Sequence, residues 1–319
     1  MNSNLIYNPT ILWLLSGDKA IAYQVKRDLL DFSEEELTTL KNELPSVGWI
    51  QKLIHLRNDD TFMWGEGIYS PKWISTHYTL LELLNMGVDA TSPFFKDSSE
   101  LLLNSMWENK GKVRANHYQD MCVCAMILSI TTNAHLYSTK LFEIVDYILL
   151  HQYVDGGWNC AWQKKDIHSS LHTTICVLEA FRDYEACGYT YRLDEIKECV
   201  PKGIEFMLRK KLFRSERTKE IIHPSMLMLS YPSRWFYNTL RALEYLASIH
   251  FPYDIRLKEA LIRLLEKKND NNRWLLQNNR VNKIHFVMEK QGKESRWNTL
   301  RILRIFKWFI PEEYELITQ

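Results

Sequence analysis

Apolar positions recur every three to four residues along most of the chain, which is the spacing of helices that bury one face. Strand-like alternation of apolar and polar positions is nearly absent, and the connectors between the periodic segments are mostly short and polar. The pattern therefore predicts an all-α protein. The predicted helices cover approximately residues 20–30, 78–86, 121–130, 140–150, 173–184, 195–210, 239–249, 257–267 and 299–309.

The sequence repeats itself at the starts of several of these helices. The seven residues beginning at Tyr237 match the seven beginning at Trp297, and weaker copies begin near residues 75, 117 and 171. Between the copies lie turns that carry Trp64, Trp158 or Trp274. A period of about 45 to 65 residues suits one helical hairpin per repeat. Five hairpins and a leading helix predict a closed ring, and because no Ser/Gly/Pro-rich linker divides the chain, we expect one domain over residues 1–319.

One repeat carries a sharper motif. Tyr147 and Ile148 are followed by Gln152, Gly156 and Trp158, and this spacing resembles the QW repeat of squalene and oxidosqualene cyclases. That repeat belongs to the superfamily of terpenoid cyclases and protein prenyltransferases. The resemblance covers about residues 48–309 and implies an α/α toroid of about five to six helical hairpins with QW-like repeats. A glutamine at a helix end can bond exposed backbone groups while a tryptophan stacks over it, so the motif argues for a fold more than for a function.

Composition narrows the function classes. Lys and Arg number 40 against 39 Asp and Glu, so there is no basic field for nucleic acid or an anionic membrane. No apolar run is long enough to span a bilayer, and the first residues do not read as a signal peptide, so we expect a cytoplasmic protein. The six cysteines lack disulfide-framework spacing and are expected to be free thiols. Trp (11), Tyr (16) and Phe (13) are abundant, which favours a small-molecule ligand among aromatic rings, and no partner protein is identifiable.

The candidate ligand-binding residues cluster just before the inner helices, where polar groups of a toroid converge on one rim. Residues 289–298, with the matching 234–238, also resemble a bacterial branch of the same superfamily to which no activity is attached. The alternative for these residues is structural: helix capping by the polar ones, and stacking of Trp on Arg to hold the repeats together. The candidates are Trp73, His77, Arg234, Trp235, Tyr237, Asn238, Arg296, Trp297 and Asn298.

A zinc site is the sharpest catalytic hypothesis. Protein prenyltransferase β subunits hold zinc through an Asp-x-Cys at one inner helix and a His at the next, and this chain has a similar order. The resemblance implies Asp120, Cys122 and His172 as zinc ligands that would activate a thiolate, with Asp120 and His172 as catalytic residues. The alternative is that Cys122 is a small buried residue on a helix face. Any cofactor other than zinc is unknown.

The leading functional prediction is a toroid that binds a small hydrophobic or amphipathic ligand, isoprenoids included, as a cyclase- or transferase-type enzyme. It would act without the DxDD acid that protonates alkenes in class II cyclases, because that motif is absent. One alternative is a glycan-active (α/α) barrel enzyme with Glu66 and Glu289 as its acid and base. Another is a toroid without catalytic activity that binds a ligand or a partner.

Overall fold

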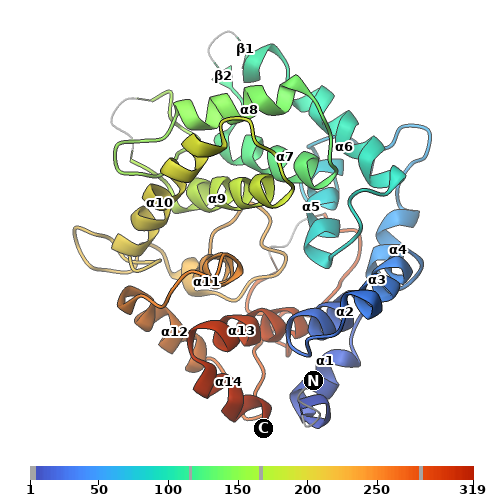
Figure 1. The fold of residues 1–319 in the computed structure, drawn as a ribbon, viewed down its shortest axis with the longest axis vertical. Coiled ribbons are helices and arrows are strands. Elements are labelled where there is room, and N and C mark those ends of the chain that lie inside the picture. The colour runs from blue at the N-terminus through green and yellow to red at the C-terminus, as the bar shows by residue number, and fades with distance from the viewer. Residues whose placement is uncertain (1–4, 115–116, 165–167, 280–282) are drawn as a thin grey trace.

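A computed structural model describes residues 5–114, 117–164, 168–279 and 283–319. In these ranges the protein is a ring of paired α-helices, and its only paired strands form the short ribbon of β1 (Lys112–Arg114) and β2 (His117–Tyr118). The structure is thus an all-α toroid, as predicted (Figure 1). The helices facing the ring centre are α2 (Lys19–Asp28), α5 (Thr76–Met86), α7 (Met121–Asn133), α9 (Leu171–Ala186), α11 (Thr239–Ser248) and α13 (Arg296–Phe309). The helices outside them are α4 (Gly48–His55), α6 (Pro93–Met106), α8 (Thr139–Leu150), α10 (Leu193–Arg209), α12 (Lys258–Leu265) and α14 (Pro311–Thr318), with α1 (Pro9–Leu15) and α3 (Glu34–Glu43) flanking α2.

All nine helices predicted from periodicity are present, within a few residues of their expected ends. Inner and outer helices differ in pattern because they bury different fractions of their surface. In α7 every residue from Met121 to Thr132 is buried, which is typical of a helix enclosed on all sides. By contrast, α10 is strongly amphipathic, since only its inward stripe, including Ile196 and Phe206, is buried. No helix in the described ranges is long and apolar enough to cross a membrane.

The three tryptophan turns share one hydrogen-bonding pattern, which repeats along the chain. Each of the three turn tryptophans is fully buried, and each makes the same two bonds. Its indole N–H donates to the carbonyl of a residue near the end of the preceding outer helix, and its backbone N–H donates to a threonine hydroxyl in the next inner helix. The indole bonds are Trp64 to Leu53 (2.6 Å), Trp158 to Ile148 (2.8 Å) and Trp274 to Leu264 (2.7 Å), and the backbone bonds are to Thr76, Thr174 and Thr299 (3.1 Å each).

The residues of the predicted QW motif act as a clamp between repeats. The Gln152 side-chain amide donates to the carbonyls of Gly156 (2.8 Å) and of Cys199 in α10 (2.9 Å). Gly156 has a φ of +95°, and a Cβ at this position would lie 2.5 Å from the carbonyl oxygen of Lys202. The turn therefore requires glycine both for its conformation and for its close approach to α10.

The connections between helices are long at one rim of the ring and short at the other. Long segments precede α5, α9, α11 and α13, whereas α5, α7 and α9 are followed by turns of a few residues. Since the inner helices run in parallel, the long segments gather at their N-terminal ends. They fill that side of the ring with packed side chains, and the opposite side is left less covered.

The ring closes between its first and last inner helices. α2 packs against α13, and the guanidinium of Arg304 in α13 forms an ion pair with Asp28 in α2 (2.5 Å). The side-chain amide of Asn8 donates to the carbonyl of Ile317 (3.1 Å), so the two ends of the chain lie beside each other (Figure 1).

Candidate functional site

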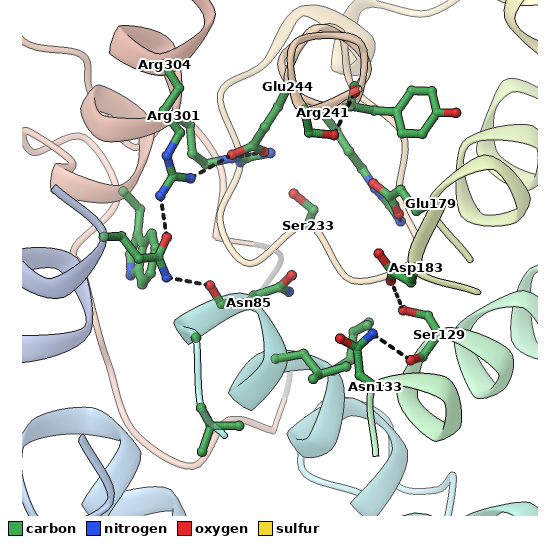
Figure 2. Close-up of a pocket in the computed structure, with 18 of the residues that line it drawn as sticks. Asn85, Ser129, Asn133, Glu179, Asp183, Ser233, Arg241, Glu244, Arg301 and Arg304 are labelled. Carbon is green, nitrogen blue, oxygen red and sulfur yellow. Dashed lines mark hydrogen bonds and ion pairs between the residues drawn. The ribbon is translucent and has the colours of Figure 1, made fainter. Parts of the chain in front are cut away.

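The largest feature at the ring centre is a cavity of about 450 Å³ between the inner helices. All six inner helices contribute to its wall, and most of the contributing residues lie toward the helices' C-terminal ends. The segment that contains Tyr231, Ser233 and Arg234 also lines it (Figure 2). Among the described lining residues, seven are basic and three are acidic. The lining is thus mostly polar, and the aromatic lining predicted from composition is limited to a few rings, including Tyr231 and Trp297.

The three acidic groups of the wall are each held by arginine. Glu179 binds Arg241 through both of its oxygens (2.8 and 2.5 Å), and Glu244 binds Arg301 (2.7 Å) and Arg304 (3.2 Å). The third, Asp183, accepts from the guanidinium of Arg182 (2.7 Å) and from the hydroxyl of Ser129. Burial raises the pKa of Glu244, but the two guanidinium groups beside it lower that pKa more, and the net shift is downward. These carboxylates are therefore paired anions that fix the arginines in place.

Arg234 is different, because no described carboxylate lies within ion-pair distance of it. Its side chain is buried (8 % exposed), and its guanidinium lies 4.4 Å above the ring centre of Trp73. One guanidinium nitrogen, Nη1, is buried without any hydrogen-bond partner. Burial lowers the pKa of Arg234 to about 10, which still leaves it charged near neutral pH. A buried cation without an anion is costly, so this position calls for a negatively charged partner.

The backbone at this position is also unusual. Both Arg234 (φ +56°) and the Trp73 beneath it (φ +83°) adopt the left-handed conformation that side chains other than glycine disfavour. Such a conformation costs on the order of 1–3 kcal/mol and persists only where the surroundings enforce it. Strain at two stacked residues that face a cavity points to a functional role for their placement.

A smaller inner pocket of about 60 Å³ lies on the other side of Tyr231 and Arg234, which line both spaces. It contains a buried carboxyl group, Glu82 of α5, whose Oε1 accepts a hydrogen bond from the Tyr231 hydroxyl (2.5 Å). Burial raises the pKa of Glu82. His285 lines the same pocket, with its Nε2 2.9 Å from the Thr79 hydroxyl, and burial lowers the His285 pKa to about 4.

The predicted ligand-binding residues divide into three groups. Trp73, Arg234 and Trp297 do meet at the two cavities, where Trp297 stacks on Tyr231 with ring centres 4.9 Å apart. A second group is occupied with bonds to the backbone, and within it only Asn238 caps a helix, as its structural alternative predicts. In that group the Tyr237 hydroxyl donates to the carbonyl of Leu212 (2.5 Å), Asn238 accepts from the backbone of Arg241 (2.8 Å), and the Asn298 amide donates to the carbonyl of Leu275 (3.2 Å).

The third group lies away from the larger cavity. His77 is completely buried without a hydrogen bond to either ring nitrogen, and burial lowers its pKa to about 3. Trp235 stacks on Phe236 with ring centres 3.8 Å apart. Arg296 points toward α1, where its Nε donates to the carbonyl of Trp13 (2.9 Å). None of these three side chains lines the larger cavity.

The two carboxylates proposed as a glycosidase pair have separate roles. Glu66 is on the surface, 71 % exposed, and pairs with Lys283 (3.3 Å). Glu289 accepts the backbone N–H groups of Arg296 (2.7 Å) and Trp297 (3.3 Å), so it stabilises the start of α13. Glu289 borders the inner pocket, whereas Glu66 lines neither central space.

The proposed zinc ligands are not gathered into a site. Asp120 is exposed at the start of α7, and Nδ1 of His172 accepts the backbone N–H of Tyr237 (2.8 Å). Cys122 is buried, and its backbone N–H donates to the sulfur of Cys160 (3.3 Å). No three His, Cys, Asp or Glu side chains within the described ranges are arranged to hold a metal ion. The structural alternative for Cys122 therefore describes it better.

Apart from Arg234, the charged residues of the cavity wall were not among the residues predicted from the sequence, although the repeat contains a signal for some of them. In the two matching copies, the second and fifth positions after Thr239 and after Thr299 line the cavity. They hold Arg241 and Glu244 in α11, and Arg301 and Arg304 in α13. Charged residues at these positions of a buried helix indicate a polar centre. Glu82 and Tyr231 have no comparable signal.

Comparisons with known proteins support the fold. No family model matches the chain, and no curated protein matches it by sequence. A solved structure of a glycosyl hydrolase family 88 protein from Bacteroides vulgatus is similar, with a TM-score of 0.50 and 10 % identity over 91 % of this chain and 90 % of that one. The apo type II terpene cyclase MstE from Scytonema gives a TM-score of 0.44 and 14 % identity, over 91 % and 87 %. The likeness to the family 88 structure supports the fold alone, an all-α toroid.

Proposed function

We propose that this α/α toroid binds a small, polar, negatively charged molecule in its central cavity, and that an acidic sugar is the class that fits the lining best. One observation carries the proposal: Arg234 is a buried cation at the base of the cavity with an unbonded nitrogen, and no carboxylate of the described residues lies within ion-pair distance of it. An anionic group bound there would supply the missing charge and hydrogen bonds. Charge-assisted bonds of this kind are among the strongest in proteins.

The rest of the lining suits a sugar. The side chains of Asn85, Ser129, Asn133 and Ser233 offer amide and hydroxyl groups to the same space (Figure 2). The rings of Tyr231 and Trp297 supply an apolar surface at the base, and a volume of about 450 Å³ lies within the ordinary range of ligand pockets. Sites with many hydrogen-bonding groups and a few rings favour polar ligands over hydrocarbons.

This proposal selects among the functions predicted from the sequence. A purely hydrophobic isoprenoid would leave the buried Nη1 of Arg234 without a hydrogen-bond partner, which is unfavourable. An amphipathic ligand fits only with its charged end among the arginines. The glycan-binding alternative agrees with the lining, but Glu66 and Glu289 are not placed as an acid–base pair in the larger cavity. We therefore propose binding, whereas enzymatic activity and a cytoplasmic location stay predictions.

Isothermal titration calorimetry with D-glucuronate and sulfate as probes tests the proposal. Both anions are expected to bind, while neutral D-glucose binds more weakly and geraniol, an isoprenoid alcohol, does not bind. The Arg234→Gln variant is expected to bind glucuronate about 10- to 100-fold more weakly, the effect of losing a hydrogen bond to a charged group. Arg296→Gln is the matched control, since Arg296 points toward α1, and should bind like the wild type. Equal affinity of wild type and Arg234→Gln, or tighter binding of geraniol, would contradict the proposal.

A further inference from the structure

The wall between the two central spaces places a buried acid beside the unpaired cation. Tyr231 and Arg234 line both the larger cavity and the inner pocket, and Glu82 lies in the inner pocket, bonded to Tyr231. Glu82 and Arg234 are not in direct ion-pair contact, so neither fully neutralises the other. Any anion that binds Arg234 from the cavity therefore adds a second negative charge near the Glu82 carboxyl.

We propose that the site takes up its anion together with a proton, and that Glu82 is the group that accepts this proton. The inference rests on the proposed function, because it concerns the same anion on Arg234. In the free protein burial disfavours ionised Glu82, while the hydrogen bond from Tyr231 and the charges of Arg234 and Arg301 favour it. A bound anion offsets the charge of Arg234, and ionised Glu82 then loses one of its two stabilising cations. Protonation removes this repulsion, and the neutral carboxyl can still accept the hydrogen bond from Tyr231.

The other titratable groups around Glu82 are less suited to this role. On α5 itself, Tyr78 has its pKa raised by burial, beyond any physiological range. In the segment before α11, burial likewise raises the pKa of Tyr231, and its hydroxyl donates a hydrogen bond to Glu82. Arg301 of α13 is paired with Glu244. Two further titratable groups, His285 and Glu289, line the inner pocket.

These two groups come from the segment before α13. His285 has its pKa lowered to about 4 by burial and by the charge of Arg234. The Thr79 hydroxyl donates to the carbonyl of Ser75 (3.0 Å), so it accepts from Nε2–H of a neutral His285. Burial raises the pKa of Glu289, but its carboxylate accepts three hydrogen bonds at the start of α13, all of which favour the ionised form. Glu82 has no backbone donor of that kind among its bonds.

The pH dependence follows from the direction of the Glu82 shift. Below its pKa, Glu82 is already neutral, so the anion binds without proton uptake and with its highest affinity. Above this pKa, binding requires uptake of a proton, and the affinity falls by up to tenfold for each pH unit. Sulfate is a suitable probe because its own charge does not change near neutral pH.

Calorimetry of sulfate binding in several buffers of different ionisation enthalpy measures this proton directly. For the wild type we expect uptake that rises with pH toward one proton for each sulfate bound. Glu82→Gln should bind sulfate with no uptake and with an affinity independent of pH, whereas Glu66→Gln, which removes a surface carboxylate, should behave like the wild type. If Glu82→Gln does not fold, an infrared difference spectrum of the wild type should still show a protonated carboxyl appearing when sulfate binds.

The outcomes separate the two proposals. Sulfate binding without proton exchange at any pH, with no new carboxyl band, would overturn the role of Glu82 and leave the anion site standing. Uptake that persists in Glu82→Gln and disappears in Glu289→Gln would assign the proton to Glu289 and would also overturn it. If neither sulfate nor glucuronate binds the wild type, the proposed function itself fails.

Discussion

Replacing Trp158 by alanine is expected to lower the free energy of unfolding by about 3–5 kcal/mol, the usual cost of removing a large buried aromatic side chain. Trp158 is fully buried, and its indole and backbone N–H groups bond α8 and α9. The variant would therefore create a void where two repeats meet, and the carbonyl of Ile148 would keep only the backbone N–H of His151 as a donor. Urea denaturation followed by circular dichroism measures the change.

Trp308 provides the matched control for this substitution. It is 42 % exposed, although its indole N–H also donates to a carbonyl, that of Phe251 (2.7 Å). Trp308→Ala is therefore expected to lower the free energy of unfolding by about 1 kcal/mol, because it removes one hydrogen bond and little buried surface. If both variants lose the same amount of stability, the buried turn tryptophan is not what holds the repeats together.

The second large effect is expected at the Glu179–Arg241 pair of the cavity wall. Glu179→Leu should destabilise the protein by about 3–5 kcal/mol, because it leaves the buried guanidinium of Arg241 without its carboxylate. Arg241 is 6 % exposed, and its other hydrogen-bond partners, the carbonyl of Phe236 and the sulfur of Cys176, are not carboxylates. The same denaturation experiment measures the loss. Glu195→Leu is the surface control, since its pair with Arg192 is exposed and should contribute little to the free energy of unfolding.

A double variant separates the cost of an unpaired charge from a loss of packing. In Glu179→Leu combined with Arg241→Met, no charge is left unpaired, and most of the stability should return. A double variant as unstable as Glu179→Leu alone would show that the pair contributes through shape and not through charge. The charged wall would then lack the electrostatic role assigned to it here.

The fold was accessible from the sequence because its determinants are local and repeated. Trp64, Trp158 and Trp274 each bond a helix that lies close by in sequence, so the same residues recur at each turn. Five helices were not predicted: α1, α3, α4, α6 and α14. α3, for example, buries only Leu37 and is stabilised by a capping box between Ser33 and Glu36. Its helical structure comes from hydrogen bonding at its start more than from an apolar face.

The candidate site was predicted only in part, since its location depends on how the long loops fold. Residues just before the inner helices were expected to face a ligand, but most of these loops pack against each other and fill that rim. The larger cavity instead lies toward the C-terminal ends of the inner helices. Glu82 and Tyr231 are 149 positions apart, and no periodic pattern indicates that they form a hydrogen bond. The repeat does indicate that Arg241 and Arg301 occupy equivalent positions, because each lies two residues after the threonine that the two copies share.

The closure of the ring between α2 and α13 bears on how a ligand reaches the cavity. Every other pair of neighbouring inner helices is joined through an outer helix, whereas this pair is joined by side chains alone. Gln24 of α2 and Arg304 of α13 both line the cavity and bond each other across this junction. Separation of the two helices would thus open the cavity wall without stretching any loop. At this junction the cavity wall is held by side-chain contacts, among them the ion pair of Arg304 with Asp28, and not by a connecting segment.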